Sequence, residues 1–324
     1  MIYDIIKISR RAEGGKNMQE LFIGQIIKER RKEQKCSQEK LCDDFMEPST
    51  LSRIENGEVI PSHDNLKAIL ERLSLPLDPY FMPIDKAELE ISNLKSEIIT
   101  NNIYENSEKG LAALERLEEI APKKNRFAAQ FILRSRAILG KREGGIICPY
   151  SDEEKLEMLM RAIRITIPKF NAEEVEGHFY TVEELKLINC IAGVYSNLGQ
   201  NKTAVDMYYQ LLKYMKKNLV DQKERNLLLI LVEYNYSRIL CMEERHKEAI
   251  EIANMGLELS IQERYSGYLG GFLTILAHSL YAQGKMEESK QNFYQAHCIY
   301  TVLRDEKNIR LAAQNLKDFF EIDI

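Results

Sequence analysis

The sequence predicts an all-α protein in which a compact bundle of short helices precedes a longer stack of helix pairs. First, apolar residues recur at helical spacing along the 324-residue chain, and strands are hard to find. Second, the stretch SQEKLCDDFMEPSTLSRIENG, from Ser37 to Gly57, holds two helix signals separated by a proline and ends on Asn-Gly. Third, three pieces of the second half align at Gly199, Glu244 and Gly284, which are 45 and 40 residues apart.

Composition is that of a soluble globular protein, with 44% hydrophobic and 29% charged residues. The chain is long enough for two domains with cores of their own. No apolar run approaches the length of a membrane span. The six cysteines are scattered without a CxxC pair or a histidine at ligand spacing. They indicate reduced thiols in a cytoplasmic protein and neither a metal site nor a cofactor.

The net charge of −5 argues against binding nucleic acid through bulk electrostatics. It leaves room for a small DNA-reading domain attached to an acidic body.

Residues 1–17 are interpreted as a leader that is possibly not native. Their end, EGGKN before Met18, back-translates to a purine-rich ribosome-binding sequence, which would make Met18 the start. The alternative is a basic arm that reaches into a minor groove.

The first domain, residues 18–75, is predicted from the order of its helix signals. A stripe of isoleucines marks a first helix over 23–34, and Ser37 is placed as the N-cap of the second. Pro48 opens a third helix, which stops at Asn56-Gly57. A fourth amphipathic helix ends at Leu73, before Pro76.

This segment resembles the lambda-repressor-like (XRE) helix-turn-helix domain. The family pattern is present as Arg31, Ser37, Gln38, Leu41, Thr50, Ser52, Glu55 and Gly57. Lys35 replaces a common glycine, and the turn before Pro48 is one residue shorter than in phage repressors, as in peptide-sensing regulators.

The resemblance implies that the third helix enters the major groove of DNA. The DNA-binding residues that it implies are Gln38, Glu47, Ser49, Thr50, Ser52, Arg53 and Asn56. Arg31 and Glu55 are implied to form a structural, partly buried ion pair, while Leu41, Leu51 and Ile54 are core. Residues 18–82 hold nine Lys/Arg against twelve Asp/Glu, so we expect binding to need a homodimer and a palindromic operator.

The second half is predicted to be an α-solenoid. Residues 76–102 form a linker and connecting helix, 103–306 the repeats, and 307–324 a C-terminal capping helix. Ala204, Ala249 and Ser289 align five residues after the repeat turns, where small residues allow close helix packing. These repeats resemble the tetratricopeptide-like α-solenoid of bacterial peptide receptors.

The first helix of each repeat should line the inner curve, where a short extended peptide would need amides for its backbone and a cation for its carboxylate. The candidate peptide-binding residues are Gln130, Arg134, Asn189, Asn197, Tyr234, Arg238, Thr274 and His278. Each could instead be an ordinary solvated side chain, and either Tyr234 or Tyr236 should be core.

The two domains together resemble the Rgg/PlcR-type (RNPP) regulators. That resemblance implies a transcriptional regulator whose solenoid senses a short signalling peptide in quorum sensing. The alternative is a DNA-binding regulator whose solenoid recruits a protein partner and binds no peptide. No GxGxxG, Walker pattern or paired His/Asp/Glu constellation indicates an enzyme.

Overall fold

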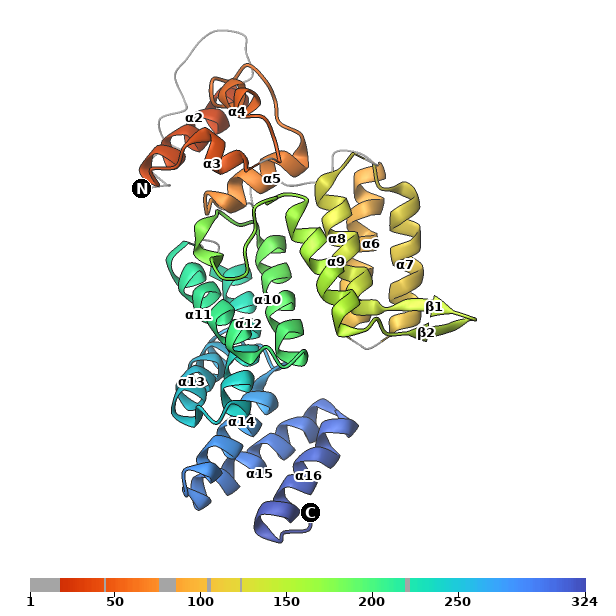
Figure 1. Cartoon of the computed structure of the whole chain (residues 1–324), viewed down its shortest axis with the longest axis vertical. Coiled ribbons are helices and arrows are strands. Elements are labelled where there is room, and N and C mark those ends of the chain that lie inside the picture. The colour runs from red at the N-terminus through yellow and green to blue at the C-terminus, as the bar shows by residue number, and fades with distance from the viewer. Residues whose placement is uncertain (1–17, 44, 76–85, 104–105, 123, 219–221) are drawn as a thin grey trace.

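The computed structural model describes residues 18–43, 45–75, 86–103, 106–122, 124–218 and 222–324. The leader prediction for residues 1–17, and the part of the linker prediction that concerns 76–85, therefore lie outside the described residues. The chain forms a small N-terminal bundle, here called the head, above a curved stack of helices (Figure 1). The all-α fold class is confirmed.

The head contains four described helices in the order expected. They are α2 (Met18–Glu33), α3 (Gln38–Cys42), α4 (Pro48–Glu55) and α5 (His63–Arg72).

Local signals in the sequence account for the boundaries of these helices. The Ser37 hydroxyl accepts a hydrogen bond from the Lys40 amide and caps α3, as expected. Pro48 occupies the first position of α4, where its missing N–H costs nothing, and Gly57 ends the helix with a φ of 70°. Leu41, Leu51 and Ile54 are buried at the centre of the head, which confirms that they are core.

Pairs of antiparallel helices make up the rest of the chain, with α16 covering the C-terminal end (Figure 1). The helices are α6 (Lys86–Ile103), α7 (Ser107–Ile120), α8 (Arg126–Leu139), α9 (Asp152–Arg164), α10 (Val182–Asn197), α11 (Asn201–Asn218), α12 (Gln222–Met242), α13 (His246–Gln262), α14 (Leu269–Ala282), α15 (Met286–Leu303) and α16 (Glu306–Phe320).

One element departs from the sequence expectation of a plain loop between α8 and α9. The strands β1 (Lys141–Glu143) and β2 (Ile146–Cys148) pair antiparallel and project from the stack (Figure 1). Gly144 and Gly145 both have positive φ, as a two-residue hairpin turn requires.

The three aligned repeats are confirmed by backbone geometry. Gly199, Glu244 and Gly284 all adopt the left-handed conformation, with φ of 73°, 58° and 76°. Ala204 and Ala249 are completely buried, so the second helix of each repeat packs closely on the first. A residue at the turn and a small residue five positions later therefore define each repeat.

Helices α6, α8, α10, α12 and α14 form the inner row of the stack. Within this row α6 contacts α8, α10 contacts α12, and α12 contacts α14. The row runs from the helix that follows the head to the C-terminal cap, so its surface is the groove of the solenoid.

Candidate nucleic-acid interface and solenoid groove

The side chains that were predicted to read bases lie on the accessible side of α4. Ser49 and Arg53 are exposed, and Thr50 and Ser52 are half-buried. The guanidinium of Arg53 lies 3.8 Å from the Glu58 carboxylate, and both side chains are more than half exposed. Such an exposed pair is weak, so Arg53 can exchange this partner for another acceptor.

Behind α4, the predicted ion pair between Arg31 and Glu55 is confirmed. Arg31 Nε and Nη2 donate to the two carboxylate oxygens of Glu55 at 2.6 and 2.8 Å. The hydrogen bond to Glu55 raises the pKa of Arg31. Gln38 Nε2 also donates to Glu55 Oε2, at 2.9 Å. The start of α3 and the end of α4 are therefore held together by one carboxylate.

Asn56 lies at the other end of α4 beside a cation that the predicted site did not include. Lys28 Nζ donates to Asn56 Oδ1 at 3.1 Å, and Gly57 follows. An amide and an ammonium group together suit a DNA phosphate. Lys28 stands in the basic cluster that is visible in the sequence, but its distance of 28 residues from Asn56 hid the pairing.

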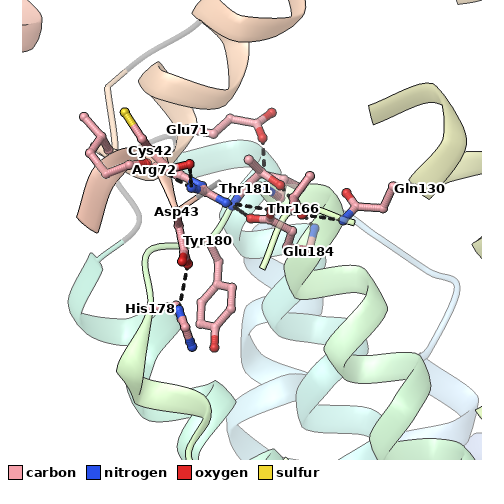
Figure 2. Close-up of polar contacts among 12 residues, drawn as sticks. Cys42, Asp43, Glu71, Arg72, Gln130, Thr166, His178, Tyr180, Thr181 and Glu184 are labelled. Carbon is pink, nitrogen blue, oxygen red and sulfur yellow. Dashed lines mark hydrogen bonds and ion pairs between the residues drawn. The ribbon is translucent and has the colours of Figure 1, made fainter. Parts of the chain in front are cut away.

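The head is joined to the solenoid by a completely buried ion pair (Figure 2). Arg72, at the end of α5, donates from Nη2 to Glu184 Oε1 of α10 at 2.9 Å, and neither side chain is exposed. Its Nη1 donates to the carbonyl oxygen of Leu41 at 2.9 Å. The guanidinium also stacks on the Phe45 ring, 4.6 Å from its centroid. Because both charges are desolvated, losing either partner would strongly destabilise the contact.

Glu184 is at the same time the capping-box residue of α10. Its Oε2 accepts from the Thr181 amide at 2.6 Å, and its Oε1 accepts from the Thr166 hydroxyl at 2.6 Å. The carboxylate of Glu71 in the head accepts from the Val182 amide at 2.9 Å (Figure 2). Two carboxylates thus satisfy amides at the N-terminus of α10, where the helix dipole favours negative charge.

Further contacts complete what we call the docking face, formed in the head by Asp43, Phe45, Asp64, Glu71 and Arg72. Asp43 Oδ2 lies 2.7 Å from His178 Nδ1 (Figure 2). The Phe45 and Phe127 rings lie 5.8 Å apart, and Asn125 donates to Asp64 at 2.5 Å. The docking face leaves the exposed side of α4 uncovered, apart from a cleft of about 650 Å³ that Glu47 and Pro48 share with Arg126 of the solenoid.

The docking network corrects the prediction for Gln130. Its side chain is completely buried, and Nε2 donates to the Thr166 hydroxyl at 2.7 Å and to the Ala162 carbonyl oxygen at 3.1 Å. Gln130 therefore supports the residues that hold Glu184 and has no surface to offer to a peptide. The α8 periodicity did not distinguish its inner face from the face that packs on α9.

Several of the predicted groove residues come together on α10 and α12. Asn235 Nδ2 donates to Asn189 Oδ1 at 3.1 Å, which adds an amide that the sequence reasoning missed. Tyr234 is half-buried, with its ring 4.8 Å from that of Tyr268, whereas Tyr236 is core, as one of the two was expected to be. Arg238 is half-buried and forms no carboxylate ion pair among the described residues.

Arg134 and Asn197 lie at opposite ends of the neighbouring inner surface. Arg134 of α8 is largely buried and pairs with Glu183 of α10. Asn197 is exposed and donates to Asp152 at 3.4 Å.

The prediction for His278 is corrected by the position of the cap. The His278 ring packs edge-on against Phe293 and Phe319, at centroid distances of 5.0 and 5.3 Å. Burial lowers the pKa of His278, so a neutral ring in an aromatic cluster is favoured. Thr274 donates back to the Gly270 carbonyl oxygen at 2.9 Å. These two positions serve packing against α15 and α16.

Within the described ranges no group of His, Cys, Asp or Glu side chains could hold a metal ion. No helix in the described part of the chain is long and apolar enough to cross a bilayer.

Two family models match the chain. The model of the RNPP family C-terminal domain matches residues 154–320, and a helix-turn-helix model matches residues 27–80. No curated protein matches.

Solved structures share this fold. PlcR of Bacillus thuringiensis, solved in complex with the peptide PapR7 and DNA, is 19% identical, with a TM-score of 0.56 over 90% of this chain and 98% of that chain. Apo PlcR is 20% identical, with a TM-score of 0.52 over 87% and 94%. Apo ComR of Streptococcus vestibularis is 20% identical, with a TM-score of 0.50 over 92% and 98%. At these identities the likeness is one of fold.

Proposed function

This chain belongs to the RNPP family, whose C-terminal domain spans more than half of it, and from that premise we propose that it is a cytoplasmic, peptide-responsive transcriptional regulator. In this proposal a homodimer reads a palindromic operator with α4 of each head, and the groove of the solenoid binds a short signalling peptide. The PlcR structure with PapR7 and DNA is a complex of the kind that we propose. The proposal assigns no catalytic role to the chain.

The observation that carries the DNA-binding part is the arrangement around α4. Ser49, Thr50 and Arg53 face solvent on a helix whose other side is fixed by the Arg31–Glu55 pair. A rigid helix with free polar side chains at its N-terminal half is what direct readout in the major groove requires.

The peptide part is supported by the chemistry of the inner row. Asn189 and Asn235 offer paired amides, Tyr234 and Tyr268 offer an aromatic surface, and Arg238 offers a cation. Amides at the spacing of neighbouring helices suit the backbone of an extended peptide. A large protein partner would instead be expected to dock on a broad apolar patch.

A selection from random duplex DNA, followed by gel shifts at moderate salt, tests the DNA-binding part. Arg53→Ala and Thr50→Ala should each weaken binding to the selected site by about 1–3 kcal/mol, roughly ten- to a hundredfold, without loss of folding. Lys202→Ala, on the outer helix α11, is the matched control and should bind as the parent does. Parent-like affinity in both α4 variants would refute readout by α4.

A further inference from the structure

A small pocket lies on the inner row where α6, α8 and α10 meet. Its volume is about 100 Å³, which is room for several water-sized groups. Ile99 and Ile138, 42% and 39% exposed, stand at this pocket. Isoleucines that are exposed on a concave surface are available to cover an aliphatic side chain of a ligand.

Cations predominate around this pocket. Arg134 and Lys186 line it, and no carboxylate is found among the described lining residues. Burial alone would raise the pKa of the nearby Glu183, but Arg134, Lys186 and Lys95 lower it below its ordinary value. Three cations therefore act on one carboxylate, and Asp64 is a further carboxylate that acts on Lys95.

The surroundings make this charge imbalance costly. Arg134 is largely buried, and burial lowers the pKa of Lys95, whose ammonium lies 5.6 Å from the centroid of the Phe131 ring. Cations in a partly desolvated site are stabilised by an anion much more than cations in water are. Asn102, which is exposed, and Ser135 add hydrogen-bonding groups to the same lining.

We propose that this pocket is a carboxylate subsite of the groove, in which Arg134 and Lys186 bind a carboxylate of the signalling peptide while Ile99 and Ile138 cover an adjoining aliphatic side chain. The inference rests on the proposed function and narrows its ligand to peptides that carry an acidic group next to an aliphatic residue. The carboxylate is either the C-terminus of the peptide or the side chain of Asp or Glu.

A synthetic library of seven-residue peptides, prepared once with free carboxyl ends and once amidated, is the probe. The full-length chain should retain peptides in which an aliphatic residue adjoins a carboxylate. Removing that carboxylate, by amidation or by Asp/Glu→Asn/Gln exchange in the peptide, should weaken binding about ten- to a hundredfold. Loss on amidation identifies the C-terminus as the source, and loss on side-chain exchange identifies Asp or Glu.

Lys186→Gln should abolish this discrimination, so that the acidic peptide and its neutral analogue bind equally. Ile138→Glu, which places a carboxylate at the pocket from a partly exposed position, should have the same effect. Lys202→Gln on α11 is the matched control and should keep the preference.

Two results would overturn the inference, and they differ in what else they remove. If the parent chain selects neutral peptides, or if Lys186→Gln keeps the preference for acidic ones, the subsite is wrong while peptide sensing stands. If no peptide of either library binds the parent chain, peptide sensing fails and the subsite fails with it.

Discussion

Two buried carboxylates of this protein, Glu55 and Glu233, are in opposite situations. Glu55 accepts hydrogen bonds from Arg31 and from Gln38, so its charge is compensated inside the head. Glu233 of α12 is 2% exposed, and its Oε2 has no hydrogen-bond partner within the described ranges. Burial raises the pKa of Glu233 to about 7, an effect that Lys216 offsets only in part. Whether a buried carboxylate stabilises the fold is therefore decided by its neighbours.

Replacement of Arg31 by Met should destabilise the head by about 3 kcal/mol, because it leaves Glu55 buried without its cation. Urea unfolding followed by circular dichroism measures this. The double variant Arg31→Met/Glu55→Leu should recover most of the loss, since the uncompensated charge is gone. A double variant as unstable as the single one would contradict this account of the pair.

Glu233→Gln should stabilise the protein at pH 8 and have little effect at pH 4.5. The unfolded carboxyl titrates near 4.5 and the folded one near 7, so the folded state binds more protons between these values. The free energy of unfolding of the parent therefore falls as pH rises through this window and levels off above it, by roughly 2–3 kcal/mol in all. Urea midpoints against pH measure it, with the exposed Glu258→Gln as control.

At the scale of elements, the repeat turn shows how a local backbone requirement appears in the sequence. The aligned position has positive φ in all three repeats, yet two repeats use glycine there and one uses Glu244. A side chain in the left-handed region is strained by contact with the following carbonyl oxygen, whereas glycine is not. The turn is thus kept in the repeat of Glu244 by the packing of α12 on α13.

Glu244→Gly should accordingly raise the stability of the solenoid by about 0.5–1 kcal/mol, because relief of strain exceeds the added freedom of the unfolded chain. The reverse exchange, Gly199→Ala, should lower stability by a similar amount or more. Thermal melts of the two variants measure both effects. A destabilised Glu244→Gly would show that this turn is not strained.

At the scale of the whole molecule, two consecutive residues connect the groove to the head. Glu183 faces Arg134 on the inner row, and Glu184 holds Arg72 of the docking face. Both stand in the first turn of α10, so a ligand that competes for Arg134 acts one residue away from the head contact. A peptide shifts the orientation of the head only if it binds one docked arrangement better than another.

Arg72→Met should loosen the head from the solenoid, because the buried Glu184 then lacks its cation, at a cost of about 3–5 kcal/mol. Amide hydrogen exchange at Val182, which the Glu71 carboxylate protects, should become faster. Exchange within α14, far from the docking face, serves as the internal control. Unchanged protection at Val182 would show that the docking face does not depend on this pair.

The sequence by itself determined what depends on neighbours along the chain. Ser37, Pro48 and Gly57 set the ends of the head helices, and the turn residues and small residues set the repeat, because caps and left-handed turns involve only a few consecutive residues. The Arg31–Glu55 pair was reached through the family pattern.

Only the tertiary structure decided which side chains meet across the two domains. Arg72 and Glu184 are 112 residues apart, and each had an ordinary local interpretation, one as a basic residue at a helix end and the other as a capping-box glutamate. Gln130 and His278 were misassigned for the same reason, since helical spacing identifies a face but not the helix that covers it. Contacts of this kind follow from how the head, the inner row and the cap pack together, which no local pattern specifies.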